Sequence, residues 1–240
     1  VHYYFAKDVA RDHDFPFRRD KSYSFGALGP DILMHLPEKL LTEEDYYRVF
    51  HEDNTPELLH YIFQRMEKEE LIPFLHGFLA HYALDSGSNF FILSLQNEGY
   101  DRQSVKDALE EAILRRRKIG SSHKISFLPQ IHVGKTLPDA IADFFVDAAR
   151  DIYQLPLSKE DMQAAYQTFM EVIQANETSF LLFRLRRRWY ERKSGHLFSK
   201  EETEQLFQEF QESYEKARRT FGLLLEKKKP CSRNFLGDYL

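Results

Sequence analysis

The stretch from Phe74 to Asp85 reads FLHGFLAHYALD and is apolar on nearly every side. A helix of this composition belongs in the interior of a folded protein, because a surface helix keeps one polar face. Two polar side chains interrupt it, His81 and Asp85, which are four residues apart and therefore share one face of a helix. A buried carboxylate needs a partner or a metal ion. The pair is thus either a structural hydrogen bond or part of a metal site.

Helical patterns also account for most of the remaining chain. Apolar residues recur at helical spacing, and the segments beginning at Ser158 and Ser199 resemble capping boxes, which mark helix starts. The expected helices are residues 3–12, 43–50, 56–69, 71–85, 102–118, 136–153, 159–190 and 200–226, with loops at 13–42, 86–100 and 119–135. With 10 Gly, 9 Pro and no alternating strand pattern, the sequence predicts an all-α fold in a single domain over residues 1–240.

Composition narrows the function classes. The 33 Lys and Arg against 38 Asp and Glu give a net charge of -5, which does not favour nucleic-acid or membrane binding through overall charge. One cysteine, Cys231, excludes an intrachain disulfide and a thiolate metal site, so any metal must be held by histidine and carboxylate. No run of about 18 apolar residues and no secretory signal is visible, so we expect a cytoplasmic protein without a membrane span.

Further histidines and acids lie ahead of this central stretch. Asp31 ends the segment GALGPD, in which two glycines and a proline favour a rigid irregular backbone. Such loops often carry functional side chains, although an ordinary turn between helices with a capping aspartate has the same pattern. His2 and His51 complete a set of three imidazoles and two carboxylates. Nitrogen and oxygen ligands in this mixture suit zinc.

The order of these residues resembles the zinc-dependent phospholipase C family, in particular its small intracellular bacterial branch, which is related to the zinc-dependent single-strand nucleases. The matching pieces are HYYF at 2–5, GALGPDI at 26–32, His51 with Thr55, and GFLAHYALD at 77–85. The match covers residues 1–118, and residues 119–240 fit as further helices. The resemblance implies an all-helical phospholipase C/nuclease-like bundle that binds up to three zinc ions and hydrolyses phosphodiesters.

The resemblance also implies roles for individual residues. His51, His81, Asp31 and Asp85 would hold one zinc ion, and Asp85 would bridge to a second ion that has His2 as a ligand. The implied chemistry is metal-assisted hydrolysis, in which the pKa of a bound water falls from about 15.7 toward 7. Asp31 would orient or deprotonate that water. The expected substrate is a phosphodiester, with phospholipid headgroups among the candidates.

The chain departs from the family pattern after Asp85. Where the family continues with His-Pro, this chain has Asn89 and Phe90, and the later His and Glu pair corresponds to Gln103 and Asp107. Amides are poorer zinc ligands than imidazoles, so we expect one zinc site to be lost and one or two ions to remain. The alternative is that Asn89 caps or turns the chain and Gln103 is solvated. For the whole chain, the alternative function is a catalytically inactive helical binding protein with one structural zinc.

A basic, aromatic stretch at residues 184–193 is the last feature with a functional interpretation. Its arginines surround Trp189 and Tyr190, a composition that suits phospholipid headgroups or nucleic-acid phosphates. The same composition is typical of a solvated helix face. The sequence predicts no oligomeric state.

Overall fold

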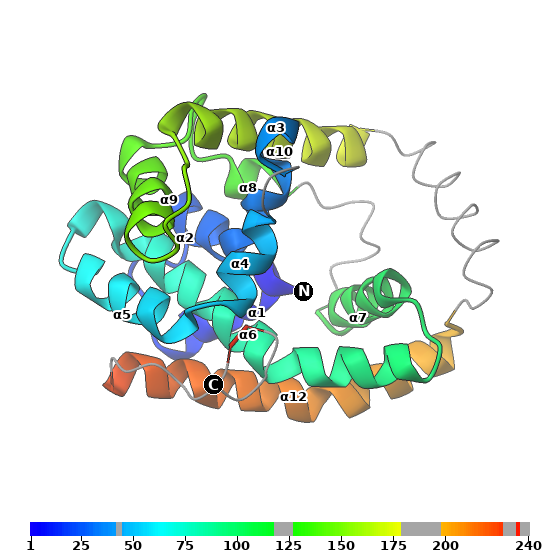
Figure 1. The fold of residues 1–240 in the computed structure, drawn as a ribbon. Helices are drawn as coiled ribbons and strands as arrows, with labels where there is room; N and C mark the ends of the chain where they lie inside the picture. Colours follow the sequence, from blue (N-terminus) through cyan, green and yellow to red (C-terminus); the bar gives the residue numbers. More distant parts are fainter. Residues whose placement is uncertain (42–44, 118–126, 179–197, 228–233, 236–240) are drawn as a thin grey trace.

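The computed structural model describes residues 1–41, 45–117, 127–178, 198–227 and 234–235 (Figure 1). Its elements are α1 (His2–Asp12), α2 (Lys21–Gly26), η1 (Gly29–His35), α3 (Glu38–Leu41), α4 (Tyr46–Glu52), α5 (Thr55–Arg65), η2 (Glu69–Leu71), α6 (Ile72–Asn97), α7 (Arg102–Arg116), α8 (Leu128–Ile131), α9 (Asp139–Asp151), α10 (Lys159–Thr178) and α12 (Lys200–Lys227). No strand occurs in these ranges, which confirms the all-α prediction. Among the described helices, none combines the length and the apolar character needed to cross a membrane.

Helix α6 is the central element of the fold. It carries the apolar stretch that begins at Phe74, and most of its residues up to Asn89 are buried. Helices α1, α2, α7 and α12 pack against it. Figure 1 shows α12 along one side of the molecule and α10 along the opposite side. A helix that is apolar on all sides is therefore covered on all sides, as its composition predicts.

The prediction of a loop at 86–100 is wrong for its first part, because α6 continues to Asn97. The polar and small residues that suggested a loop, from Ser86 to Asn89, are buried in a helix contact. A Cβ on Gly87 would lie 3.0 Å from the Cβ of Ala217 on α12, so the small residues allow the two helices to approach closely. Tertiary packing has overridden the local preference.

Other expected boundaries differ in smaller ways. The expected loop at 13–42 contains three short elements, α2, η1 and α3. Helix α10 begins at the predicted position and is described to Thr178, while the basic stretch 184–193 lies outside the described residues.

The two predicted capping boxes form as expected at the starts of α10 and α12. The backbone N–H of Asp161 donates to Ser158 Oγ at 3.1 Å, and the N–H of Ser158 donates back to the Asp161 carboxylate at 3.2 Å. Ser199 and Glu202 make the same reciprocal pair at 3.1 and 2.7 Å. Each box satisfies two backbone donors that a helix N-terminus leaves unpaired.

Two glycines bring α2 into backbone contact with α6. A Cβ on Gly26 would lie 2.1 Å from the carbonyl oxygen of Phe74, and a Cβ on Gly77 would lie 2.2 Å from that of Tyr23. Neither distance is compatible with any larger residue, so the helices cross at this point because both residues lack a side chain. The crossing fixes η1, which follows α2, against the next turn of α6.

Candidate metal centre

Five of the predicted site residues converge from four elements on one point. His2 comes from α1, Asp31 from η1, His51 from α4, and His81 and Asp85 from α6. Their ligand atoms form two overlapping groups, His2 with Asp31 and His81, and His51 with His81 and Asp85. Within each group these atoms all lie within 4.8 Å of one another. Because both groups include His81, they describe one centre.

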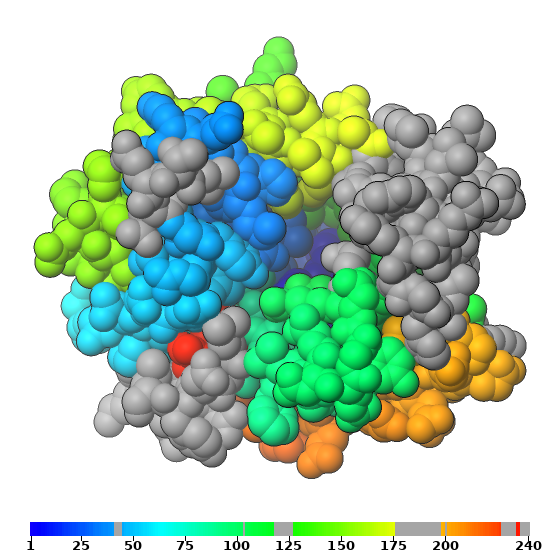
Figure 2. Space-filling model, turned by 45° about the vertical axis from the view of Figure 1, so that its right-hand side comes forward, coloured from blue at the N-terminus to red at the C-terminus, as the bar shows by residue number. Residues whose placement is uncertain are grey.

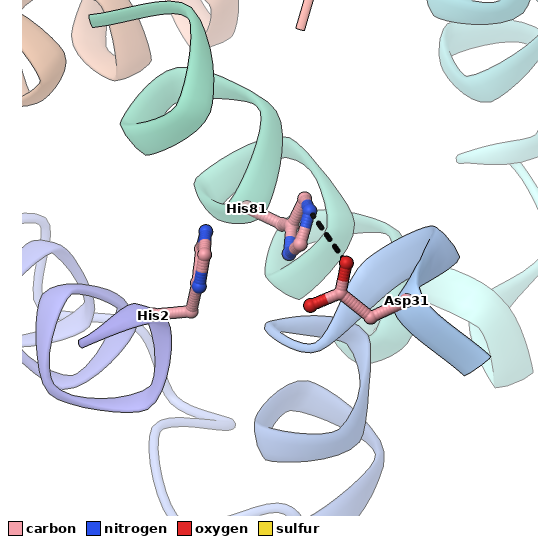
Figure 3. A group of neighbouring side chains, drawn as sticks. All are labelled: His2, Asp31 and His81. Atoms are coloured by element: carbon pink, nitrogen blue, oxygen red, sulfur yellow. Dashed lines mark ion pairs between the residues drawn. The ribbon is translucent and has the colours of Figure 1, made fainter. Parts of the chain in front are cut away.

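The backbone turn at Gly29 positions Asp31 in this centre. The backbone of Gly29 has φ +48°, and a Cβ there would lie 2.8 Å from Cγ of His81. Glycine adopts this conformation without the steric cost of other residues. The turn places Asp31 Oδ1 3.8 Å from His81 Nε2 and 3.5 Å from His51 Nε2. Figure 3 shows this carboxylate facing the ring of His81, with His2 on the other side of that ring.

The two fully buried histidines are held in one tautomer. His81 Nδ1–H donates to the carbonyl oxygen of Ala27 at 3.2 Å, and His51 Nδ1–H donates to that of Tyr47 at 2.6 Å. A carbonyl oxygen can only accept, so each Nδ1 carries a proton and each neutral ring presents a bare lone pair at Nε2. Backbone hydrogen bonds of this kind are typical of metal-binding histidines, because they fix the ring orientation.

Both Nε2 atoms face carboxylate oxygens without forming hydrogen bonds. His81 Nε2 lies 3.2 Å and His51 Nε2 lies 3.9 Å from Asp85 Oδ2, and neither buried nitrogen has a hydrogen-bond partner among the described residues. Lone pairs that face carboxylates in a buried space need a cation between them, either a proton or a metal ion. Ligands around tetrahedral zinc are about 3.4 Å apart, given bonds of about 2.1 Å. The four distances from these two nitrogens to Asp31 and Asp85 fall around that value, so the residues fit a metal ion.

His2 contacts the outer oxygen of the shared carboxylate. Its Nε2–H donates to Asp85 Oδ1 at 2.7 Å, and its ring stacks on His81 with centroids 4.3 Å apart and an angle of 14° between the planes. At this distance His2 and Asp85 form a direct hydrogen bond. His2 therefore orients the carboxylate in the present geometry, which is the role of a residue behind a metal ligand.

The charges of the cluster shift the pKa of each carboxyl downward. Burial raises the pKa of Asp31, but the imidazoles of His81, His51 and His2 outweigh burial and lower it to about 2. The pKa of Asp85 lies well below its ordinary value, because His2 and His81 outweigh the effect of burial in the same way. Both carboxylates are therefore ionised at neutral pH and available as ligands.

The pKa values of His2 and His81 shift in opposite directions. Burial lowers the pKa of His2 to about 4, and the nearby carboxylates offset burial only in part. For His81 the attraction of Asp85 and Asp31 is stronger than the effect of burial, so its pKa is raised. Without a metal ion, a proton on His81 is thus stabilised by the two carboxylates.

The positions where the chain departs from the family pattern lie outside this cluster. The amide of Asn89 is buried, donates from Nδ2 to the carbonyl oxygen of Phe235 at 2.8 Å, and accepts from Arg102 at 3.4 Å. Asp107 is exposed on α7. The backbone of Gln103 belongs to α7, and its side chain lies outside the described part of the chain. None of the three belongs to either metal-compatible group among the described residues.

Phe235 is a contributor to the centre that the sequence did not indicate. Its ring is fully buried and packs against His51 with centroids 5.2 Å apart, and its N–H donates to the carbonyl oxygen of His51 at 3.1 Å. It also contacts Tyr82 on α6 at 4.8 Å. The residue lies 184 positions after His51, and no local pattern connects the two. The contact of His51 with Tyr47, by contrast, follows from helical spacing, because Tyr47 precedes His51 by one helical turn.

The centre opens to the surface on the side of Asp31. The side chain of Asp31 is 33% exposed, whereas those of His51 and His81 are 2% and 0% exposed. Figure 2 shows a hollow with the blue N-terminal segment at its floor and with α4, α10 and the green α6–α7 region around it. The Asp31 carboxylate is thus the part of the cluster that is most exposed to solvent.

Comparison with models of known protein families, with curated proteins and with solved structures found no match to this chain. The fold and the centre themselves define a class, an all-α protein with a buried histidine and carboxylate cluster suited to a metal ion.

Proposed function

We propose that the chain is a metal-dependent phosphodiester hydrolase of the zinc-dependent phospholipase C type. The proposal is supported most strongly by the two bare Nε2 atoms of His51 and His81, which face the carboxylates of Asp31 and Asp85 without hydrogen-bond partners in the described part of the chain. In a purely structural pair, both buried nitrogens are expected to have hydrogen-bond partners. The order of these residues along the chain, which resembles that family, supports the reaction class.

Zinc is the metal that this ligand set favours. Two imidazole nitrogens and two carboxylate oxygens, with nitrogen–oxygen distances of 3.2 to 3.9 Å, suit zinc better than magnesium or calcium, which prefer six or more oxygens. A zinc ion in this place would polarise a phosphoryl oxygen and lower the pKa of a water molecule.

The residues of the centre have different proposed roles in the reaction. Asp31 is ionised and is the most exposed of the four ligand residues, so it is placed to accept a hydrogen bond from the attacking water and to orient it. His2 holds the Asp85 carboxylate in its orientation through Oδ1. His51 and His81 are anchored by backbone carbonyl groups, which keeps the centre rigid during the reaction.

The proposed substrate is a phosphodiester, and phospholipid headgroups are favoured over nucleic acid. A protein with a net charge of -5 lacks the overall attraction on which most nucleic-acid binding depends. An assay with a phosphatidylcholine emulsion, single-stranded DNA and bis(4-nitrophenyl) phosphate separates these substrates.

Metal analysis followed by a hydrolysis assay tests the proposal. Protein purified without chelator is expected to contain stoichiometric zinc, and zinc added to the stripped protein is expected to raise its melting temperature. The loaded protein is expected to hydrolyse bis(4-nitrophenyl) phosphate, with zinc and manganese compared. Absence of bound metal together with absence of stabilisation by added zinc would rule out the proposal.

One observation favours a second candidate, a catalytically inactive protein with one structural zinc. The direct hydrogen bond between His2 and Asp85, at 2.7 Å, closes the place where a second ion would bridge. Stoichiometric zinc without hydrolysis of any of the three substrates is the outcome that identifies this candidate.

A further inference from the structure

Arg102 is a cation beside the centre whose side chain is poorly satisfied. In the described part of the chain its side chain makes one hydrogen bond, from Nη2 to Asn89 Oδ1 at 3.4 Å, and no ion pair with a carboxylate. Its Nε–H is buried and has no acceptor there. The later arginines of the same region differ, since Arg115, Arg116 and Arg117 each contact a carboxylate. A charged donor that is buried without an acceptor is unfavourable, and a ligand that supplies an acceptor would relieve this cost.

The position of Arg102 relative to the centre is fixed by Asn89. Asn89 follows Asp85 by one turn of α6, so the two share the face that begins with His81. The Asn89 amide is held from the other side by Phe235, whose N–H donates to the carbonyl oxygen of His51. The guanidinium of Arg102 therefore contacts the residue that lies one helical turn after Asp85.

Asn89 links Arg102 to the helix that carries two residues of the centre. Arg102 Nη2 donates to Asn89 Oδ1, and Asn89 lies on α6, which also carries His81 and Asp85. Helix α7, which begins at Arg102, belongs to the green region beside the hollow of Figure 2.

We propose that Arg102 is an anion-binding residue of the metal centre, whose guanidinium donates hydrogen bonds to a phosphoryl oxygen of the bound phosphate ester. The inference rests on the proposed hydrolase function and adds the group that recognises the substrate. A phosphoryl group that contacts a metal ion through one oxygen keeps other oxygens with negative charge. The planar fork of arginine matches two such oxygens, and a buried charge-assisted hydrogen bond is stronger than a neutral one.

Binding of inorganic phosphate to the zinc-loaded chain tests this role. Calorimetry is carried out with wild type, Arg102→Met, Arg102→Lys and the matched control Arg115→Met, whose guanidinium pairs with Glu111 on the exposed face of the same helix. We expect Arg102→Met to weaken phosphate binding at least about tenfold. Arg102→Lys, which keeps the charge and loses the fork, is expected to have an intermediate affinity. Arg115→Met is expected to bind phosphate as wild type does.

The readouts separate this inference from the proposed function. Zinc content and melting temperature are measured for every variant, and unchanged zinc in Arg102→Met is expected, since Arg102 is not a ligand. Equal phosphate affinity in wild type, Arg102→Met and Arg102→Lys, or no phosphate binding by loaded wild type, overturns the role of Arg102. Phosphate binding that depends on Arg102, without hydrolysis of any of the three substrates, supports the anion site and rules out the hydrolase function. Acetate as the probe distinguishes a phosphoryl site from a general anion site, because the former is expected to prefer phosphate.

Discussion

The backbone of Gly29 lies directly against the imidazole of His81. A Cβ on Gly29 would be 2.8 Å from Cγ of His81 and 3.1 Å from Cβ and Cδ2 of the same side chain. Two segments separated by about fifty residues are thus in contact where the metal-compatible cluster forms, and Asp31 follows Gly29 by two positions. The approach of this turn determines where the Asp31 carboxylate lies relative to both Nε2 atoms.

Gly29→Ala is therefore expected to damage the centre as well as the fold. The left-handed φ of +48° and the clash with His81 together are expected to cost about 2–5 kcal/mol of unfolding free energy, measured by urea denaturation. Gly99→Ala is the matched control, because Gly99 has φ +95° and, among the described residues, no atom lies within 4 Å of the place its Cβ would take. We expect it to cost about 1–2 kcal/mol and to leave zinc affinity unchanged. Equal zinc affinity in both variants would show that the turn does not position Asp31.

Asp85→Asn tests the carboxylate that contacts both His2 and His81. The amide has nearly the same shape, so the fold is expected to persist, but the ligand loses its charge. Zinc affinity, measured by competition with a chelating dye, is expected to fall by more than about 100-fold, since even residues behind the ligands contribute about 10–100-fold. Asp161→Asn is the control, because Asp161 is also buried but belongs to the capping box of α10. Loss of zinc in the control alone would refute the assignment of Asp85.

The sequence predicted the elements that depend on local patterns. The apolar composition around Phe78 predicted a buried helix, and the boxes at Ser158 and Ser199 predicted the starts of α10 and α12. The extension of α6 through Gly87 was not predictable, because the reason for it is the contact with Ala217, which lies 130 positions later. Glycine and serine favour loops locally, and here distant packing decides.

In the candidate site, too, the sequence predicted some features and not others. The i,i+4 spacing of His81 and Asp85, and the rigid turn before Asp31, indicated side chains that the structure brings together. The contacts of Phe235 with His51 and of Arg102 with Asn89 depend on how distant helices pack, and no spacing in the sequence encodes them. The direct hydrogen bond from His2 to Asp85 was likewise not predictable, since the family pattern implied an ion between them.

The stability of the protein in acid is expected to depend on Asp161. Burial raises the pKa of this carboxyl, but hydrogen bonds from Ser158 and the nearby Lys39 outweigh burial and lower it. A lowered folded-state pKa gives stability that is present above the ordinary value of about 4 and is lost as the pH falls through the lowered value. Asp161→Asn is therefore expected to be less stable than wild type by about 1–2 kcal/mol at pH 7, with a smaller difference at pH 3. Urea denaturation in chelator at both pH values measures this, and a difference independent of pH would contradict it.

Phe235 is expected to stabilise both the core and the histidine cluster. Its fully buried ring fills the space between His51 and Tyr82, so Phe235→Ala leaves a cavity and is expected to cost about 3–5 kcal/mol of unfolding free energy. Because the cavity adjoins His51, zinc affinity is expected to fall as well, and Phe235→Leu is expected to restore part of both. Phe90→Ala is the control, because its side chain is 75% exposed and its removal is expected to change stability by less than about 0.5 kcal/mol. If Phe235→Ala lowers stability while zinc affinity stays at the wild-type value, Phe235 supports the core without positioning His51.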